Sequence, residues 1–475
     1  MRALVGELRA ANAELRAANA DLQRVVEGQA ARIAELERQL GADSSTSSRP
    51  PSSDGPYRKP PRRSSRTASG RRPGKQPGQP GSTLPLIGDP DEIVCCDPVC
   101  CSGCGADLSG APVTGVIRRQ VTEVSPPPRP RVTEYQILTR TCPGCGAAAT
   151  GASPACAPGR AQYGPGVLAR AAELLCAHYL PVARAARLMR SMLGVAPSVG
   201  FMATVRHRAA AVLEHTFLPR VRELLRQAGV LHADETPGRA DGGLEYVHVA
   251  ATEFLTVMHT GGRAKTDIDA GGVLGGYAGT IVRDGYAGYT HLIDAHHAWC
   301  GAHLLRDLRA FHTADPHRQV WAAAMADTLT DAHHAATAAR AAGHDALAPD
   351  TLRQIRNHYR GAVAKGITDN PRAGPLGRDA LTLARRFRDH EDMILRFVVD
   401  LAVPFTNNQA ERDLRPVKIQ QRTSGGCWRT LAGIADFAVV QSYLSTATKW
   451  GLDTLDVLNQ LFTTGAWLPP APEPC

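Results

Sequence analysis

The chain has 475 residues, a formal net charge of +9 and 12 cysteines. That length allows several domains with at least one sizeable hydrophobic core. The basic balance favours a polyanionic partner, most simply nucleic acid, over a membrane surface. No apolar run is long enough to span a membrane, and the charged N-terminus does not resemble a signal peptide. We therefore expect a cytoplasmic protein whose cysteines are reduced, buried or bound to metal.

Residues 1–40 carry a seven-residue repeat of apolar side chains. The d positions hold Leu8, Leu15, Leu22 and Leu36, with Gln29 interrupting, and the a positions hold Val5, Asn12, Asn19, Val26, Ile33 and Leu40. Asparagine at a costs stability but favours a parallel two-stranded coil in one register. A single amphipathic helix packed on the rest of the chain would show the same periodicity. Because the repeat lasts more than five heptads and a linker follows, we predict an oligomerisation helix.

Residues 41–88 are rich in Ser, Pro and Gly, so we expect no secondary structure there. No acidic residue occurs between Gly55 and Gly88. The basic residues of this linker include Arg62, Arg63, Arg71 and Arg72. Such a run can be only a solubilising tail. Its place between an oligomerisation helix and a cysteine-rich segment favours a flexible arm for DNA phosphates.

Two CxxC motifs lie within residues 89–160. They are Cys101 with Cys104 and Cys142 with Cys145, and a glycine follows each second cysteine. Two such thiolate pairs can complete a tetrahedral structural Zn²⁺ site, although Cys100 could replace Cys101. The strings "VTGVIRRQVTEV" and "RVTEYQILTR" alternate like a β-hairpin that would bring the two motifs together. We therefore predict a zinc-binding β module over unligated thiols.

Residues 161–227 contain three amphipathic segments separated at Pro and Gly. The turn before "APSVGFMATVRHRAA" is similar to that of a helix-turn-helix, with Arg206 and Arg208 able to reach phosphates. Three short helices are common in all classes of protein. The pattern therefore predicts a helical region that could bind DNA.

Strand-like patterns begin after residue 228, and two of them end in acids. "GVLHADETP" brings Asp234 to the end of one apolar run, and "GTIVRDGYAGY" brings Asp284 to the end of another. Carboxylates at the ends of neighbouring buried strands are natural metal ligands. Glu235 adjoins Asp234, and because neighbours on a strand point to opposite faces, only one of the two can face a bound metal. For either acid alone, an ordinary charged strand end remains the simpler interpretation.

A third carboxylate follows in "PFTNNQAERDLRPVK". The paired asparagines suit a helix N-cap, and Glu411, Arg412 and Arg415 then share one helical face. Apolar runs on both sides argue for partial burial, and a buried carboxylate needs a partner. Three carboxylates from two strands and a helix can hold two Mg²⁺ or Mn²⁺ ions for phosphodiester chemistry.

The segment "HHAWCGAHLLRDL" offers a second possible zinc set. It contains His296, His297, Cys300 and His303. One helical turn separates Cys300 from His303, but that spacing is common by chance. We favour a helix beside the active site, with His303 and Arg306 near DNA phosphates.

Together, "HADETP", "RDGYAGY" and "NNQAERDLRPVK" resemble the DDE transposases of the insertion-sequence sixty-six family, as does the order of the N-terminal segments. The resemblance implies an RNase H-like catalytic core with Asp234, Asp284 and Glu411 as its triad and a long insertion before the glutamate. It implies a bacterial protein that binds double-stranded element ends and target DNA and is associated with the nucleoid when bound. The N-terminal coiled coil would make it a homo-oligomer. Small accessory proteins often accompany such elements.

We therefore predict a multidomain DNA transposase. Its expected parts are a coiled coil (1–40), a basic linker (41–88), a zinc-binding β module (89–160), a helical DNA-binding region (161–227), an RNase H-like α/β core (228–295 and 396–465), a helical insertion (296–395) and a tail (466–475). Lys418 joins the predicted DNA-binding residues. The alternatives are a zinc-containing DNA-binding regulator with an inactive core and a nuclease of the same fold.

Overall fold

The computed structural model describes residues 2–41, 84–124, 129–154, 156–157, 159–371 and 374–470. The chain divides into two compact units, Met1–Gly55 with Pro130–Cys475, and Pro56–Arg129. Each unit is described by itself below. The predicted phosphate contacts Arg62, Arg63, Arg71 and Arg72 lie outside the described residues.

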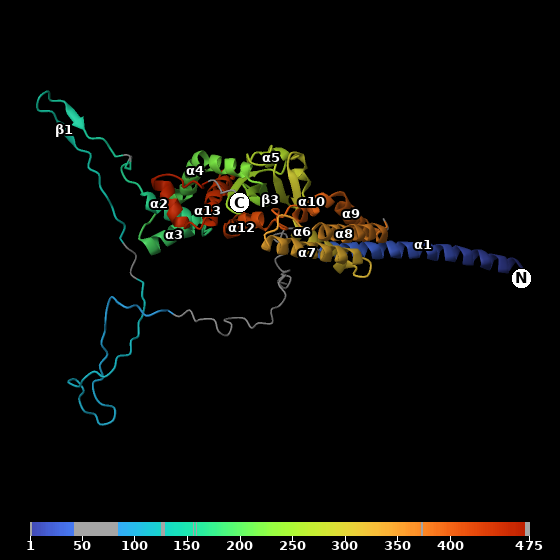
Figure 1. Cartoon of the computed structure of the whole chain (residues 1–475), viewed down its shortest axis with the longest axis horizontal. Helices are drawn as coiled ribbons and strands as arrows, with labels where there is room; N and C mark the ends of the chain where they lie inside the picture. The colour runs from blue at the N-terminus through green and yellow to red at the C-terminus, as the bar shows by residue number, and fades with distance from the viewer. Residues whose placement is uncertain are drawn as a thin grey trace. The chain divides into compact units, whose positions relative to one another are not determined.

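A five-stranded sheet forms the centre of the larger unit (Figure 1). Its strands are β3 (Val230–Ala240), β4 (Gly243–Ala251), β5 (Thr256–Gly261), β6 (Thr280–Arg283) and β7 (His296–Trp299), and their order is β5-β4-β3-β6-β7. The first three form an antiparallel meander, whereas β6 pairs in parallel with β3 and β7 pairs in parallel with β6. This mixed α/β arrangement is compatible with an RNase H-like core.

The predicted core boundary at residue 295 falls one strand too early. His296–Trp299 pairs with β6 as the last strand of the sheet. The two histidines at its start hide the apolar alternation that a buried strand would show. His297 is nevertheless buried in the sheet, where it accepts a hydrogen bond from Arg283. The helical segment predicted for 296–395 therefore starts after β7.

Alternating side chains of the sheet enter two hydrophobic clusters. On β6, Ile281 belongs to the first cluster and Val282 to the second. The first cluster is completed by helices α2 (Pro165–Cys176), α3 (Val182–Leu193), α4 (Val199–Gln227), α12 (Asn408–Thr423), α13 (Leu431–Lys449) and α14 (Thr454–Thr463). Both faces of the central strands are thus covered by helices, as buried parallel pairing requires.

The second cluster contains the helices that follow β7. They are α6 (Gly301–Ala314), α7 (Val320–Ala341), α8 (Pro349–Asp369), α9 (Gly374–Asp389), α10 (Glu391–Ile394) and α11 (Arg396–Val399). In Figure 1, α6 to α9 gather in one group that is coloured yellow to orange. The short helices α5 (Lys265–Asp269) and η2 (Ala287–His291) lie within the sheet connections. No helix of the described residues is apolar and long enough to cross a membrane.

The three helices predicted before the core are present as α2, α3 and α4. Gly194 ends α3 with a positive φ of 65°, a conformation that glycine adopts without a steric penalty. Ser198 then begins α4 by accepting a hydrogen bond from the backbone N–H of Phe201. Arg206, expected to be able to reach phosphates, is half-buried, and its guanidinium lies 5.2 Å from the centre of the Trp428 ring and donates to the Gly433 carbonyl.

The hairpin predicted between the two CxxC motifs is wrong for the described residues. Residues 113–124 contain no strand, and residues 131–140 are extended only at their end. Instead, β1 (Thr139–Thr141) pairs with β2 (Ala148–Thr150), which closes a hairpin around Cys142 and Cys145. Side chains on both faces of the two predicted strands are exposed. Neither segment therefore has a buried face that would fix the register of strand pairing.

Residues Arg2–Gly41 form one helix, α1. The apolar heptad residues whose side chains are described are exposed, among them Leu15, Leu22, Val26, Ile33 and Leu36. The helix agrees with the predicted periodicity. Its pairing in a coiled coil stays a prediction.

Candidate active site

Asp234 and Asp284 lie on neighbouring strands in matching positions. The parallel register of β3 and β6 pairs His232 with Val282. Asp234 follows His232 by two residues, and Asp284 follows Val282 by two residues. Because successive side chains along a strand alternate between its two faces, the two acids lie on the same side of the sheet. Adjacent strands are about 4.8 Å apart, so this register brings the two acids together. The sheet therefore presents a pair of carboxylates, one from the middle of β3, which continues past its expected end at Asp234 to Ala240, and one directly after β6.

Glu411 reaches the same region from the first turn of α12. Ala410, Leu414 and Val417 recur at helical spacing and are buried in the first hydrophobic cluster. Glu411 is half-buried on the flank of this apolar face. Asp284 and Glu411 both act electrostatically on Asp234. We call Asp234, Asp284 and Glu411 the carboxylate cluster.

Asn407 ties the start of α12 to β3, which differs from its predicted role as a helix cap. Its side chain caps no backbone N–H of α12. Instead, its Nδ2 donates to the Ala233 carbonyl at 2.8 Å, and its Oδ1 lies 3.0 Å from Nδ1 of His232. The side chain is fully buried, so these strand contacts fix the point at which the helix leaves the sheet.

The electrostatics of the carboxylate cluster are unbalanced. Burial raises the pKa of Asp234 well above its ordinary value, and the negative charges of Asp284, Glu235 and Glu411 raise it further. Burial also lowers the pKa of Lys418, although the attraction of Asp234 and Glu411 opposes that shift. The half-buried ammonium of Lys418 acts on Asp234 and Glu411, and the buried guanidinium of Arg283 acts on Asp284. A bound cation would relieve the repulsion among the acids that raises the pKa of Asp234.

Arg283 is a positioning residue that the sequence analysis missed. It is buried immediately before Asp284, and its Nη1 donates to the backbone carbonyls of Asp284 (2.8 Å) and Tyr286 (3.0 Å). Its Nε donates to Nδ1 of His297, whose Nε2 faces the Leu292 carbonyl. The backbone N–H of Tyr286 donates in turn to the Asp284 carboxylate. The arginine in "TIVRDG" was the available signal, because a buried cation in a strand needs dedicated acceptors.

Glu235 has partners of its own. Its Oε1 pairs with Arg263 at 2.6 Å, and its Oε2 accepts a hydrogen bond from the Tyr289 hydroxyl at 2.7 Å. The side chain is 3% exposed. A carboxylate that is already paired and hydrogen-bonded needs no metal ion. This arrangement agrees with the choice of Asp234 over Glu235.

A buried ion pair anchors α12, and the sequence analysis did not identify it. Lys449 of α13 lies 2.8 Å from Asp413, with the two side chains 10% and 6% exposed. Asp413 also accepts from Ser445 (2.9 Å) and Thr256 (3.2 Å). Lys449 donates to the backbone carbonyls of Thr252 and Leu255 as well. The network joins α12, α13 and the start of β5, and so holds the helix that carries Glu411.

The remaining predicted DNA contacts surround the carboxylate cluster with different exposures. Arg412 and Arg415 are exposed on α12, and Arg412 donates to Gln409 at 2.8 Å. His303 and Arg306 are half-buried on α6. Nδ1 of His303 lies 4.0 Å from a carboxylate oxygen of Glu411. These helices therefore bring basic side chains to the border of the acidic site.

The histidine-rich segment does not assemble as the zinc set considered above. His297 is engaged by Arg283, and His296 is exposed. Cys300, His303 and Glu411 instead have ligand atoms within 4.8 Å of one another. The carboxylate that completes this group comes from α12, more than a hundred residues away along the chain.

The two CxxC turns have the same local geometry, and we call them the cysteine knuckles. In the first, the N–H of Cys101 donates to the Ala106 carbonyl, and the N–H of Gly105 donates to the Cys101 carbonyl. In the second, the N–H of Cys142 donates to the Ala147 carbonyl, and the N–H of Gly146 donates to the Cys142 carbonyl. In each knuckle, the backbone N–H groups two and three residues after the first cysteine hydrogen-bond to its sulfur. These hydrogen bonds lower the pKa of the Cys101 and Cys142 thiols. The parallel with Cys142 favours Cys101 over Cys100 as the ligand.

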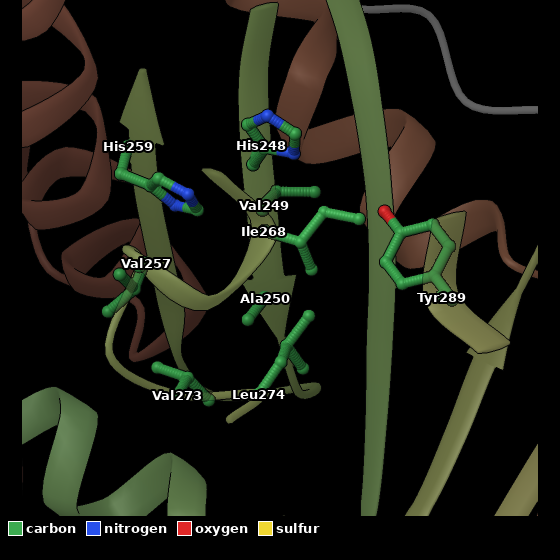
Figure 2. Close-up of a pocket in the computed structure, with 10 residues that line it drawn as sticks. His248, Val249, Ala250, Val257, His259, Ile268, Val273, Leu274 and Tyr289 are labelled. Carbon is green, nitrogen blue, oxygen red and sulfur yellow. The ribbon is translucent and has the colours of Figure 1, made fainter. Parts of the chain in front are cut away.

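A small cavity lies beside β4 and β5 (Figure 2). Most of its lining is aliphatic, including Val249, Val257 and Leu274. His248 and His259 stack at its border, 4.8 Å between ring centres. Their Nε2 atoms face the backbone carbonyls of Gly262 and Asp267. No candidate metal ligand of the carboxylate cluster lines this cavity, and we assign it no catalytic role.

The fold is a mixed sheet covered by helices, and acids from β3, from the end of β6 and from α12 face the same region. This is an α/β protein compatible with an RNase H-like core. Residues 160–435 match the family model described as Transposase IS66 family. The chain belongs to this transposase family. Residues 1–85 match a second model, described as Family of unknown function (DUF6444). No curated protein matches the chain.

Proposed function

We propose that this transposase cleaves DNA strands at the ends of its insertion sequence and joins them to target DNA, with Asp234, Asp284 and Glu411 as its catalytic residues. The observation that supports the proposal is the electrostatic action of Asp284 and Glu411, from separate elements, on the buried carboxyl of Asp234. The matching register of β3 and β6 supports the pairing of the two aspartates. The raised pKa of Asp234, caused by burial and by the other acids, supports the proximity of all three.

The carboxylate cluster fits divalent cations, because the charges of Asp284 and Glu411 act on the buried carboxyl of Asp234 and raise its pKa. Hard cations such as Mg²⁺ or Mn²⁺ prefer carboxylate oxygens. Two such ions would supply activation of the attacking oxygen and stabilisation of the leaving oxygen. Asp234, Asp284 and Glu411 would hold them. Arg283 would keep the Asp284 backbone in place through its two carbonyl contacts.

The basic side chains around the cluster are suited to DNA phosphates. Arg412 and Arg415 are exposed beside Glu411, and guanidinium groups bind phosphate oxygens through paired hydrogen bonds. Lys418 acts on Asp234 and Glu411, and His303 lies 4.0 Å from Glu411. Together with Arg306 they would orient the strand that is cut. Hydrolysis yields a 3′-hydroxyl and a 5′-phosphate. That hydroxyl then displaces a target 3′-oxygen, so one phosphodiester forms as another breaks and no covalent protein intermediate is needed.

The N-terminal segments are assigned supporting roles in this proposal. The exposed apolar face of α1 supports self-association, which would pair two subunits with two DNA ends. The thiolate-stabilising turns support structural Zn²⁺ at Cys101, Cys104, Cys142 and Cys145. The basic linker would follow DNA phosphates without reading sequence.

The test is strand cleavage and joining of a labelled duplex that carries the ends of the encoding element, with Mg²⁺ or Mn²⁺. Wild type should give metal-dependent joined product, and Glu411→Ala should bind the duplex but neither cut nor join it. Full activity of that variant would remove Glu411 from the site. Cutting without joining would favour a nuclease or a missing accessory protein. Tight binding without chemistry in both chains would favour the regulator.

A further inference from the structure

Cys300, His303 and Glu411 form a compact group of three different ligand types. Cys300 stands at the N-cap of α6, and His303 lies in the first turn of that helix. Glu411 comes from the first turn of α12. Their sulfur, nitrogen and oxygen ligand atoms all lie within 4.8 Å of one another. The two helix starts are held together because the Gly301 N–H donates to the Phe405 carbonyl at 2.8 Å.

Two ligand atoms of this group lack the strong partners that would otherwise explain them. Nδ1 of His303 is buried and has no hydrogen-bond partner among the described residues. Sγ of Cys300 accepts the backbone N–H of Asn407 at 3.2 Å, and the backbone N–H groups of His303 and Ala302 also favour its thiolate form. These contacts are compatible with a thiolate, because an N–H donor stabilises negative charge on sulfur. Burial raises the pKa of the free Cys300 thiol, whereas a coordinated metal ion deprotonates a thiol outright.

The donor set selects a different metal from that of the carboxylate cluster. Thiolate and imidazole ligands are typical of Zn²⁺, and carboxylate ligands alone are typical of Mg²⁺ or Mn²⁺. Three protein ligands leave a fourth zinc position for water. Glu411 belongs to both groups, since it acts on Asp234 and also lies 4.0 Å from Nδ1 of His303.

We propose that Cys300, His303 and Glu411 form a Zn²⁺ site that competes with the Mg²⁺ site for Glu411. When Zn²⁺ is bound, Glu411 is turned towards α6, and Asp234 and Asp284 lose their third carboxylate. Zn²⁺ is then an inhibitor of the metal-dependent reaction. The zinc site itself rests on the geometry of the two helix starts, and its inhibitory effect rests on the proposed function.

Cobalt binding tests the site without reference to activity. Full-length protein is titrated with Co²⁺, whose thiolate charge-transfer absorption reports sulfur ligands, and bound Zn²⁺ is counted separately. Compared with wild type, Cys300→Ser should lose one zinc ion per chain and the matching share of the cobalt band. Its hydroxyl can still accept the Asn407 N–H, so the fold is kept. The affinity of this site should fall by at least about 10–100-fold.

Matched variants separate ligand loss from a general effect of removing a cysteine. Cys176 is also fully buried in the larger unit, but it lies on α2, away from this group. Cys176→Ser should keep wild-type zinc content and cobalt absorption. His303→Gln should lose the same zinc ion as Cys300→Ser. Equal metal content in wild type, Cys300→Ser and His303→Gln would overturn the site.

Competition with Mn²⁺ tests the shared use of Glu411. Free Mn²⁺ is measured by electron paramagnetic resonance while Zn²⁺ is added to the full chain. Zn²⁺ should weaken Mn²⁺ binding in wild type and Cys176→Ser but not in Cys300→Ser. The competition is refuted if Zn²⁺ binds at Cys300 and leaves Mn²⁺ affinity unchanged. Absence of Mn²⁺ binding in wild type would contradict the proposed function and the inhibition, while the cobalt result would still decide the zinc site.

Discussion

Asp234, Asp284 and Glu411 come from three elements, whereas each cysteine knuckle is a single turn of a few residues. The carboxylate cluster depends on strand register, a buried asparagine and a buried ion pair. Each knuckle depends on backbone hydrogen bonds within one loop, and Cys104, Cys142 and Cys145 are exposed. The first region is therefore prepared for a cation by the folded core. The second can gain its order from the cation itself, as small zinc modules do.

The largest expected effect comes from Asp234→Asn. Losing a metal-binding carboxylate should remove several kcal/mol of transition-state stabilisation, or about 10³-fold in cleavage rate. The same change should stabilise the metal-free fold at alkaline pH. A raised carboxyl pKa means that folding stability falls as pH rises from the ordinary aspartate value through the raised one. Chemical unfolding at several pH values should show this decline in wild type and not in Asp234→Asn.

Glu235→Gln is the matched control on the same strand. In contrast to Asp234→Asn, it should lower the stability of the fold and leave the cleavage rate nearly unchanged. It breaks the pair with Arg263, which is 41% exposed and therefore partly screened by solvent. We expect a loss of about 1–3 kcal/mol in unfolding free energy and a cleavage rate within a few-fold of wild type. If Glu235→Gln is stable but no longer binds the metal, Glu235 and not Asp234 is the metal ligand.

Breaking the buried pair that anchors α12 should give the next largest effect. Lys449→Met leaves Asp413 as a buried carboxylate without its cation, which typically costs about 3–5 kcal/mol. Urea unfolding measures the loss. The double variant Lys449→Met with Asp413→Leu should recover part of it, because the uncompensated charge is gone. If Lys449→Met and the double variant both unfold at the same urea concentration as wild type, this pair does not stabilise the position of α12.

His259 should make the core sensitive to acid. Burial lowers the pKa of His259 to about 4, below its ordinary 6.5. The folded state thus binds fewer protons than the unfolded state between these values, and stability is lost as pH falls from 6.5 towards 4. The difference corresponds to at most about 3 kcal/mol. His259→Gln keeps a donor for the Asp267 carbonyl and should flatten the pH dependence of unfolding by about one proton.

How much of this could be predicted follows from the range of each interaction. Strands β3 and β6 were predictable because their apolar runs are local, and Glu411 lies on α12 as its helical spacing indicated. Strand β7 was not, because His297 owes its burial to Arg283, fourteen residues earlier. The pair of Asp413 with Lys449 spans 36 residues and has no local signature. Asn407 carried the composition of a cap, but β3 offered its side chain stronger partners.

Zinc removal should have the smallest effect on the core and is the sharpest test of the contrast between the two regions. In the Cys300→Ser chain, which isolates the knuckle metal, a strong chelator should release about one Zn²⁺ per chain. Hydrogen exchange should then accelerate around β1 and β2, whereas the unfolding free energy of the five-stranded core should change by less than about 0.5 kcal/mol. Cys142→Ser should reproduce both results, and Cys95→Ser, an exposed cysteine outside the knuckles, neither. A loss of several kcal/mol in the core would mean that the knuckles support the fold that prepares the carboxylate cluster, and the two regions would then be a single cooperative structure.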